Sequence, residues 1–123
     1  MYFVIIGGGR VGYYLGRELI QENHEVLIVE KDTMPQTNIC NNLGSVCVHG
    51  DGCEVATLEE VGTSRADIFI AVTGDDEDNL IACQLAKHRF NVPRTIARLS
   101  NPANKTAFKQ LGIDVTVSST DII

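Results

Sequence analysis

Hydrophobic residues along this chain gather in short runs, and the segments between those runs repeat their hydrophobic residues at helical spacing. Short, continuous hydrophobic runs are typical of strands that are covered on both faces of a parallel sheet. The predicted strands are Tyr2–Ile6, Glu25–Glu30, Val46–His49, Ile68–Val72, Thr95–Leu99 and Val115–Val117. The pattern therefore predicts buried strands that alternate with helices.

Start and stop signals place the helices between these strands. The predicted helices are Arg10–Asn23, a segment from Asp32 or Thr33 to Leu43, a short helix over Val55–Val61, a helix that follows Thr73–Asp78 and carries Leu80–Ala86, and Pro102–Leu111. Strands that alternate with helices form a parallel sheet, because each right-handed crossover places a helix on one of its faces. This order predicts an α/β fold: a Rossmann-like, doubly wound parallel six-stranded sheet in the order 3-2-1-4-5-6, with helices on both faces.

Glycines follow the first strand at G-x-G-x-x-G spacing, at Gly7, Gly9 and Gly12. In such a turn the first glycine permits the tight bend, the second lets a pyrophosphate approach the backbone, and the third lets the helix pack closely. The N–H groups of the first helical turn then form a site for phosphate oxygens. Glu30 follows about 20 residues later, where a carboxylate holds ribose hydroxyls. The stretch predicts a nucleotide site, and a purely structural glycine turn is the alternative.

Length and charge exclude several classes of protein. A chain of 123 residues is long enough for one domain with a single core. Its formal net charge of −6 argues against general nucleic-acid binding, which needs a basic face. No hydrophobic run approaches the roughly 20 residues needed to cross a membrane, and we expect no cleavable signal at the N-terminus.

The four cysteines form no C-x-x-C pair, and we expect reduced cytosolic thiols. Cys47, His49, Asp51 and Cys53 alternate, which could suggest a metal site. A strand end followed by a glycine turn explains that alternation better, because buried free cysteines are common core residues. We therefore expect no metal ligand here.

The predicted sheet and its helices use the whole chain. A dehydrogenase on this fold normally needs a second domain or long insertions to hold a substrate and supply an acid or a base. His24, His49 and His88 are scattered, and no Ser/His/Asp or Cys/His set is apparent. We therefore expect a ligand-binding switch and not an enzyme. The alternatives are the cofactor-binding half of an NAD-dependent oxidoreductase and a dimerisation module with a vestigial nucleotide site.

Four stretches, in their order and spacing, resemble the N-terminal domain of the Trk/Ktr potassium-uptake regulators, called the RCK or KTN (TrkA-N) domain. They are Gly7–Gly12, His49–Gly52, Val72–Leu80 and Ile96–Pro102. The resemblance covers essentially the whole chain. It implies a cytoplasmic module at the inner face of the cell membrane that binds NAD/NADH or ATP/ADP, with AMP also possible, and gates a potassium channel or transporter. It also implies homodimers, which in the family often assemble into octameric rings.

The resemblance also assigns candidate cofactor-binding residues. Glu30 matches the ribose-binding acid, and its carboxylate would repel a 2′-phosphate, so NADP is disfavoured. Asp51 either accepts a hydrogen bond from adenine or caps the following helix, and Asp75 either lines the site or caps a helix. Arg10 either reaches a phosphate or is a solvated arginine. The full set is Gly7, Gly9, Arg10, Val11, Gly12, Glu30, Lys31, Asp32, Asp51, Gly52, Thr73, Gly74, Asp75, Asn79 and Arg98.

Family members usually continue into a crossover helix and a C-terminal ligand-binding domain. This sequence ends at Thr120–Ile123, where that helix is expected to begin. Residues 1–123 are therefore expected to correspond to the nucleotide-binding domain alone.

Overall fold

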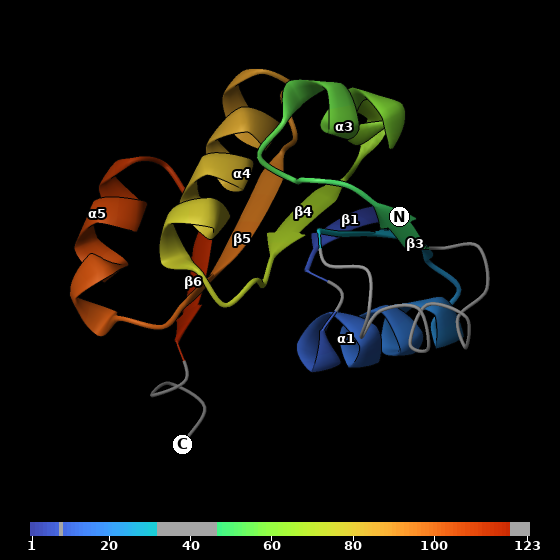
Figure 1. Ribbon diagram of the computed structural model, residues 1–123, viewed down its shortest axis with the longest axis horizontal. Helices are drawn as coiled ribbons and strands as arrows, with labels where there is room; N and C mark the ends of the chain where they lie inside the picture. The colour runs from blue at the N-terminus through green and yellow to red at the C-terminus, as the bar shows by residue number, and fades with distance from the viewer. Residues whose placement is uncertain (8, 32–46, 119–123) are drawn as a thin grey trace.

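In the part of the chain that the structure describes, six strands form one sheet in the order β3-β2-β1-β4-β5-β6, and every neighbouring pair is parallel. The structure is a computed structural model, which describes residues 1–7, 9–31 and 47–118 (Figure 1). The strands are β1 Tyr2–Ile6, β2 Glu25–Glu30, β3 Cys47–His49, β4 Ile68–Ala71, β5 Arg94–Leu99 and β6 Val115–Ser118. The predicted Rossmann-like fold and strand order are therefore confirmed.

The helices of the described part also follow the hydrophobic pattern. They are α1 Arg10–Gln21, α3 Val55–Glu60, α4 Asp76–His88 and α5 Lys105–Gln110, with 3-10 turns η1 Thr63–Arg65 and η2 Pro102–Asn104. The helix predicted over residues 102–111 begins as η2, because the Asn101 side chain accepts a hydrogen bond from the Ala103 N–H and tightens the first turn. The helix predicted from Asp32 or Thr33 to Leu43 lies outside the described residues.

The two faces of the sheet bury different residues of the same strand, because successive side chains of a strand point to opposite faces. On one face Val4 and Ile6 of β1 join the core beneath α3, α4 and α5, whose buried residues include Leu58, Ala82 and Phe108. On the other face, Phe3 and Ile5 pack with Leu15, Leu19 and Ile20 of α1. Figure 1 shows α1 on its own side of the sheet.

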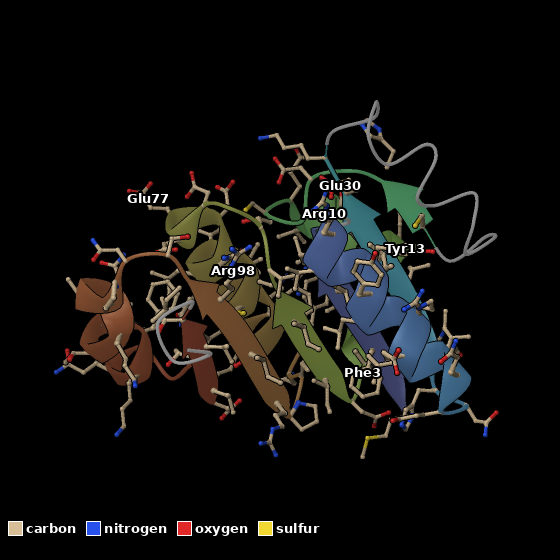
Figure 2. All side chains as sticks on the ribbon, turned by 90° about the horizontal axis from the view of Figure 1, so that it is seen from below. Phe3, Arg10, Tyr13, Glu30, Glu77 and Arg98 are labelled. Carbon is tan, nitrogen blue, oxygen red and sulfur yellow. The ribbon has the colours of Figure 1, made fainter. Side chains whose placement is uncertain are left out.

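Part of the sheet carries no helix of the described residues on its α1 face. Figure 2 shows α1 over β1 and β2, with β4 and β5 open to view beside it. A groove of about 330 Å³ runs there, and its lining is almost wholly hydrophobic. The groove is lined by Val11, Leu15, Ile70, Val72, Ile96, Arg98, Val117 and Ser118.

The Asp76 carboxylate fastens the start of α4 to the loop that follows β5. It accepts hydrogen bonds from the backbone N–H groups of Ser100 and Asn101, at 2.6 and 3.0 Å, and from the Asn104 side chain at 2.9 Å. Burial would raise the pKa of Asp76, but these hydrogen bonds outweigh it and hold the pKa below its usual value. The ionised form therefore stabilises the fold.

Asp76→Ala should destabilise the domain by about 1 kcal/mol, less than the 1.5–3 kcal/mol typical of charged hydrogen bonds because solvent screens this carboxylate. The lowered pKa means that this stabilisation is complete above pH 3.8, the ordinary pKa of the group, and is lost as the pH falls through the folded-state value. Urea unfolding between pH 7 and pH 3 measures both effects. Glu77→Ala is the control, since Glu77 lies exposed in the same first turn; an equal loss in both variants would contradict the assignment.

Candidate functional site

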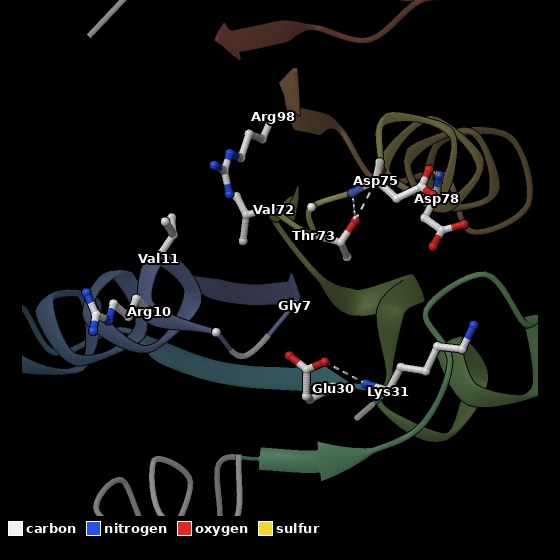
Figure 3. Close-up of a pocket in the computed structure, with 12 residues that line it drawn as sticks. Gly7, Arg10, Val11, Glu30, Lys31, Val72, Thr73, Asp75, Asp78 and Arg98 are labelled. Atoms are coloured by element: carbon white, nitrogen blue, oxygen red, sulfur yellow. Dashed lines mark hydrogen bonds between the residues drawn. The ribbon is translucent and has the colours of Figure 1, made fainter. Parts of the chain in front are cut away.

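A cleft lies at the carboxyl ends of the central strands, where β1 and β4 are neighbours and the order of the strands reverses direction. Open α/β sheets bind their ligands at such a switch point. The cleft has a volume of about 600 Å³. Its lining residues are Gly7, Gly9, Arg10, Val11, Glu30, Lys31, Val72, Thr73, Gly74, Asp75, Asp78 and Arg98. Figure 2 shows Arg10, Glu30 and Arg98 at this end of the sheet, and Figure 3 shows the cleft at close range.

In the turn after β1, each of the three glycines has a different structural environment. Gly7 has φ +105°, a conformation that side chains disfavour, and its N–H donates to Val29 O at 2.8 Å. A Cβ on Gly12 would lie 1.9 Å from the Gly7 carbonyl oxygen, so only glycine lets α1 begin this close to the turn. A Cβ on Gly9 would meet no atom within 4 Å, because Gly9 borders the cleft. The predicted turn and close packing are confirmed.

Two helices present their N-termini to the cleft, and they differ in charge. The first helical hydrogen bond of α1 joins the Tyr13 N–H to Gly9 O, so the N–H groups of residues 10–12 have no helical acceptor. No acidic residue lies in the first turn of α1. In α4, Asp75 caps the helix by accepting from the Asp78 N–H, and three acidic residues follow in the first turn. An anion is therefore favoured at α1 and opposed at α4.

Two arginines add positive charge at the open helix end. Arg10 begins α1 and is exposed, and Arg98 is half-buried near the end of β5. Both line the cleft, and within the described part of the chain neither forms a salt bridge. Figure 3 shows Arg98 beside Val72, across from α1. The arrangement can neutralise a ligand that carries phosphate groups.

Asn79 holds the loop between β4 and α4 in place. Its side chain is fully buried. Its Oδ1 accepts from the Thr73 N–H at 3.0 Å and from the Thr73 hydroxyl at 2.6 Å, and its Nδ2 donates to the carbonyl oxygens of Thr73 and Arg98 at 3.1 and 3.0 Å. All hydrogen-bonding capacity of the amide is used inside the protein. Asn79 therefore lies beneath the cleft and positions Thr73 and Arg98 along its wall.

A recess opens beside the cleft at the end of β3. It shares Glu30, Lys31 and Thr73 with the cleft and adds Asp51 and Gly52. Gly52 is required there, since a Cβ would lie 2.4 Å from the Ile6 side chain. The recess thus extends the cleft past the carboxylate of Glu30.

The alternatives that the sequence left open for two acids are partly decided by the structure. Asp75 caps α4 and also lines the cleft, so both readings hold for its position. Asp51 does not cap α3, whose N-cap residue is Glu54. One oxygen of Asp51 instead accepts from the Cys53 N–H at 2.9 Å and closes the turn after β3, and the residue faces the recess.

Of the fifteen residues assigned from the resemblance, the structure places most on these two connected surfaces. Gly12 and Asn79 support the cleft from below, and Asp32 lies outside the described residues. The assignment missed Val72 and Asp78, which both line the cleft. The signal for Val72 is its position at the end of a predicted strand beside the switch point. Asp78 lies in the first turn of α4, where an acid is ordinarily explained by the helix dipole.

The cysteines show one departure from expectation. Cys53 and Cys83 are free, as predicted, but Cys47 is disulfide-bonded, so the expectation of reduced thiols is wrong for that residue. Burial raises the pKa of Cys53 to about 11, helped by the charges of Asp78 and Asp51, so its thiol stays protonated at neutral pH. Among the described residues, no three His, Cys, Asp or Glu side chains gather as a metal site would require.

Comparison with known proteins gives the cleft its context. The TrkA-N domain family matches residues 3–119. A Trk system potassium uptake protein TrkA homolog from Methanothermobacter thermautotrophicus is 43% identical over 118 residues, which are 96% of this chain and 54% of that protein. The chain therefore spans about half the length of the curated relatives it matches.

Solved structures of GsuK share the fold. The GsuK channel bound to NAD has a TM-score of 0.84 and 27% identity, over 98% of this chain and 21% of that chain. GsuK bound to ADP has a TM-score of 0.85 and 27% identity, over 98% of this chain and 31% of that chain. Within residues 1–7, 9–31 and 47–118, this chain has no helix with the length and hydrophobicity that crossing a bilayer requires.

The surroundings of Gly12 and Gly9 predict different effects of the same substitution on the stability of the domain. Gly12→Ala should destabilise the domain by about 1–3 kcal/mol, because the new methyl group meets backbone atoms that must move. Gly9→Ala should melt close to the unmodified chain, because its methyl group enters open space. Thermal unfolding followed by circular dichroism compares the two. A Gly12→Ala variant as stable as Gly9→Ala would show that α1 does not begin against the Gly7 carbonyl.

Proposed function

The chain belongs to the TrkA-N domain family, and we propose that it is the nucleotide-sensing regulatory domain of a potassium-uptake system. The role is regulatory and not catalytic. Its partner is a membrane potassium channel or transporter, beside which the domain works as a homodimer, in octameric rings, at the cytoplasmic face. The printed names of the TrkA relatives, which concern potassium uptake, support this partner.

One observation carries the nucleotide assignment: the uncapped N-terminus of α1 and the Arg10 and Arg98 side chains border one cleft at the switch point. Backbone N–H groups, the helix dipole and two guanidinium groups together favour a ligand with several phosphate charges. The acidic first turn of α4 leaves only the α1 side of the cleft for those charges. A diphosphate that bridges α1 and β5 fits this distribution.

Glu30 supports the second half of the assignment. It ends β2 beside the phosphate-binding turn, where its carboxylate accepts ribose hydroxyls. The ligand class is therefore NAD(H) or an adenine nucleotide (ATP, ADP or AMP). Solved GsuK structures with NAD and ADP support the class, and that protein is 27% identical to this chain.

Regulation follows from differential binding. A nucleotide changes the state of a partner channel only by as much as its affinity differs between two arrangements of the paired domains. Contacts to the α1 turn and to Arg98 come from different parts of the sheet, so the affinity depends on how those parts are spaced. Oxidised and reduced dinucleotide, or ATP and ADP, are the signals that this domain distinguishes.

Thermal unfolding of the purified chain with each nucleotide tests the proposal. NAD(H) or an adenine nucleotide at 100 times its dissociation constant should stabilise the domain by about 2.7 kcal/mol. Gly9→Ala should abolish the rise in melting temperature that the nucleotide causes, because the new methyl group occupies the space where a phosphate would approach the backbone of residue 9. It should not lower the melting temperature of the ligand-free chain, since that space is otherwise open. If no nucleotide stabilises the chain, or if Gly9→Ala responds normally, the cleft is not the nucleotide site.

Glu30 makes a separate prediction about the ribose. NADPH should bind at least about tenfold more weakly than NADH, because the carboxylate repels the 2′-phosphate. Glu30→Gln keeps the oxygen that accepts from the Lys31 N–H and removes the charge, so it should raise the affinity for NADPH relative to NADH. Calorimetric titration of both ligands gives the ratio. An unchanged ratio would mean that Glu30 does not face the adenine ribose.

A further inference from the structure

Cys47 differs from the other described cysteines in its covalent state. It is disulfide-bonded, whereas Cys53 and Cys83 are free. The sulfur bonded to Cys47 therefore belongs to a residue outside the described ranges, and Cys40 is the remaining cysteine of the sequence. Disulfides are rare in the cytoplasm, where those that form are usually transient and serve catalysis or redox sensing. For a domain that works at the cytoplasmic face, this disulfide points to a redox-sensing role.

The disulfide lies at the start of β3, the edge strand of the sheet. β3 has three residues and, within the described part of the chain, pairs with β2 alone, with Cys47 opposite Ile28 and His49 opposite Glu30. The Cys47 side chain is half-buried against the hydrophobic cluster that contains Ile28. A short edge strand makes few contacts of its own, so it opens at a lower free-energy cost than the central strands.

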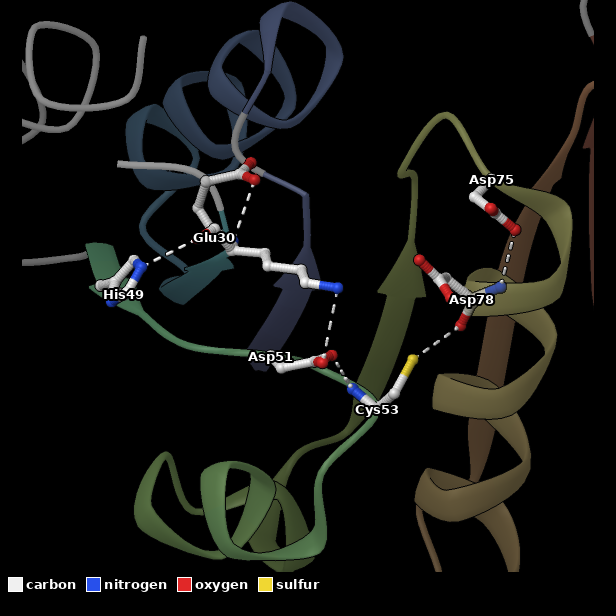
Figure 4. A network of polar contacts seen from close by, with 7 residues as sticks. Glu30, His49, Asp51, Cys53, Asp75 and Asp78 are labelled. Atoms are coloured by element: carbon white, nitrogen blue, oxygen red, sulfur yellow. Dashed lines mark hydrogen bonds and ion pairs between the residues drawn. The ribbon is translucent and has the colours of Figure 1, made fainter. Parts of the chain in front are cut away.

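The end of β3 holds the backbone of two residues that line the nucleotide cleft, Glu30 and Lys31. The Gly50 N–H donates to the Glu30 carbonyl oxygen at 2.8 Å, and the His49 ring donates to the Lys31 carbonyl oxygen, also at 2.8 Å. Figure 4 shows His49 beside Glu30, with the hydrogen bond leading from its ring toward the end of β2. Opening of β3 would release both carbonyl groups and loosen this wall of the cleft.

We propose that the disulfide at Cys47 is a regulatory redox site, whose formation favours nucleotide binding and whose reduction weakens it. This inference rests on the nucleotide-binding function proposed above. The disulfide restricts the conformations of the unpaired strand, so it raises the population of chains in which β3 is paired with β2. The apparent affinity of a ligand scales with the population of the binding-competent state, so the oxidised chain binds its nucleotide more tightly.

The reaction partner is a dissolved low-molecular-weight thiol and its disulfide. A thiolate attacks one sulfur of the protein disulfide, which breaks the S–S bond and forms a mixed disulfide. A second thiolate displaces the protein thiolate from the mixed disulfide and forms the low-molecular-weight disulfide. The protein thereby gains two electrons and two protons, and oxidation reverses both steps. Cys53 and Cys83 do not compete, because Cys83 is fully buried and the thiol of Cys53 stays protonated at neutral pH.

Comparison of the oxidised chain with the chain reduced by glutathione tests the inference. Alkylation in denaturant, followed by mass measurement, should find two free thiols in the oxidised chain and four in the reduced chain. Calorimetric titration of ADP and of NADH should give dissociation constants at least about threefold higher for the reduced chain. Hydrogen exchange in residues 28–31 and 47–50 should be faster after reduction, with no change in β5 and β6.

Two variants and a matched control separate the disulfide from other effects of the reductant. Cys47→Ser should bind ADP as weakly as the reduced chain and should not respond to glutathione. Cys40→Ser should behave in the same way, because it removes the remaining sulfur. Cys83→Ala is the control, since it removes a free thiol beneath α4 and should keep the difference between the oxidised and reduced forms.

Several results would overturn the inference. A disulfide that excess glutathione leaves intact would be purely structural. Equal or tighter nucleotide binding by the reduced chain would show that the disulfide does not favour binding, and unchanged hydrogen exchange in residues 47–50 would show that reduction does not open β3. If neither form bound ADP or NADH, the proposed function itself would fail, and hydrogen exchange would still decide whether the disulfide controls the strand.

Discussion

The contact between Gly12 and the Gly7 carbonyl is the constraint on which the cleft depends. It brings the start of α1 so close to the end of β1 that no side chain fits between them. This closeness places the free N–H groups of residues 10–12 directly above the switch point of the sheet. A helix that began one turn further from the strand would present the same dipole to solvent, where water screens it.

The electrostatics of the cleft follow from a difference between two helices that begin at the same edge. The first turn of α4 is neutralised by its own acids, and one of them, Asp76, is committed to the loop after β5. The first turn of α1 has no acidic residue, and Arg98 of β5 adds positive charge to the same cleft. Positive charge therefore gathers at one end of the ligand surface and carboxylates at the other, and this polarity orients a molecule with a phosphate end and a neutral end.

The sequence predicted the fold well because a parallel sheet buries its strands on both faces, and six hydrophobic runs marked those strands directly. Glu30 was singled out by its place at the end of a predicted strand and Arg98 by the resemblance, and both line the cleft. The role of Asp76 could not be predicted, because its partners lie 24 to 28 positions away and meet only when β4 and β5 are paired. The resemblance implies that Asn79 steadies the loop after β4, and its hydrogen bonds to Thr73 confirm this. The turn role of Asp51 was missed since a cap of α3 and a local turn have the same sequence signal.

The buried amide of Asn79 links residues of the site that come from separate segments of the chain. It joins the loop after β4 to the end of β5, while the Val72 N–H donates to Ile6 O at 2.9 Å and joins that loop to the end of β1. The Gly7 N–H and the Gly50 N–H continue the chain of contacts to β2, each at 2.8 Å. A ligand held by Arg98 and by the recess would therefore lie across a continuous line of hydrogen bonds between strand ends. Its affinity then depends on the spacing of all of them, which is the physical requirement for a domain that converts nucleotide occupancy into a change of shape.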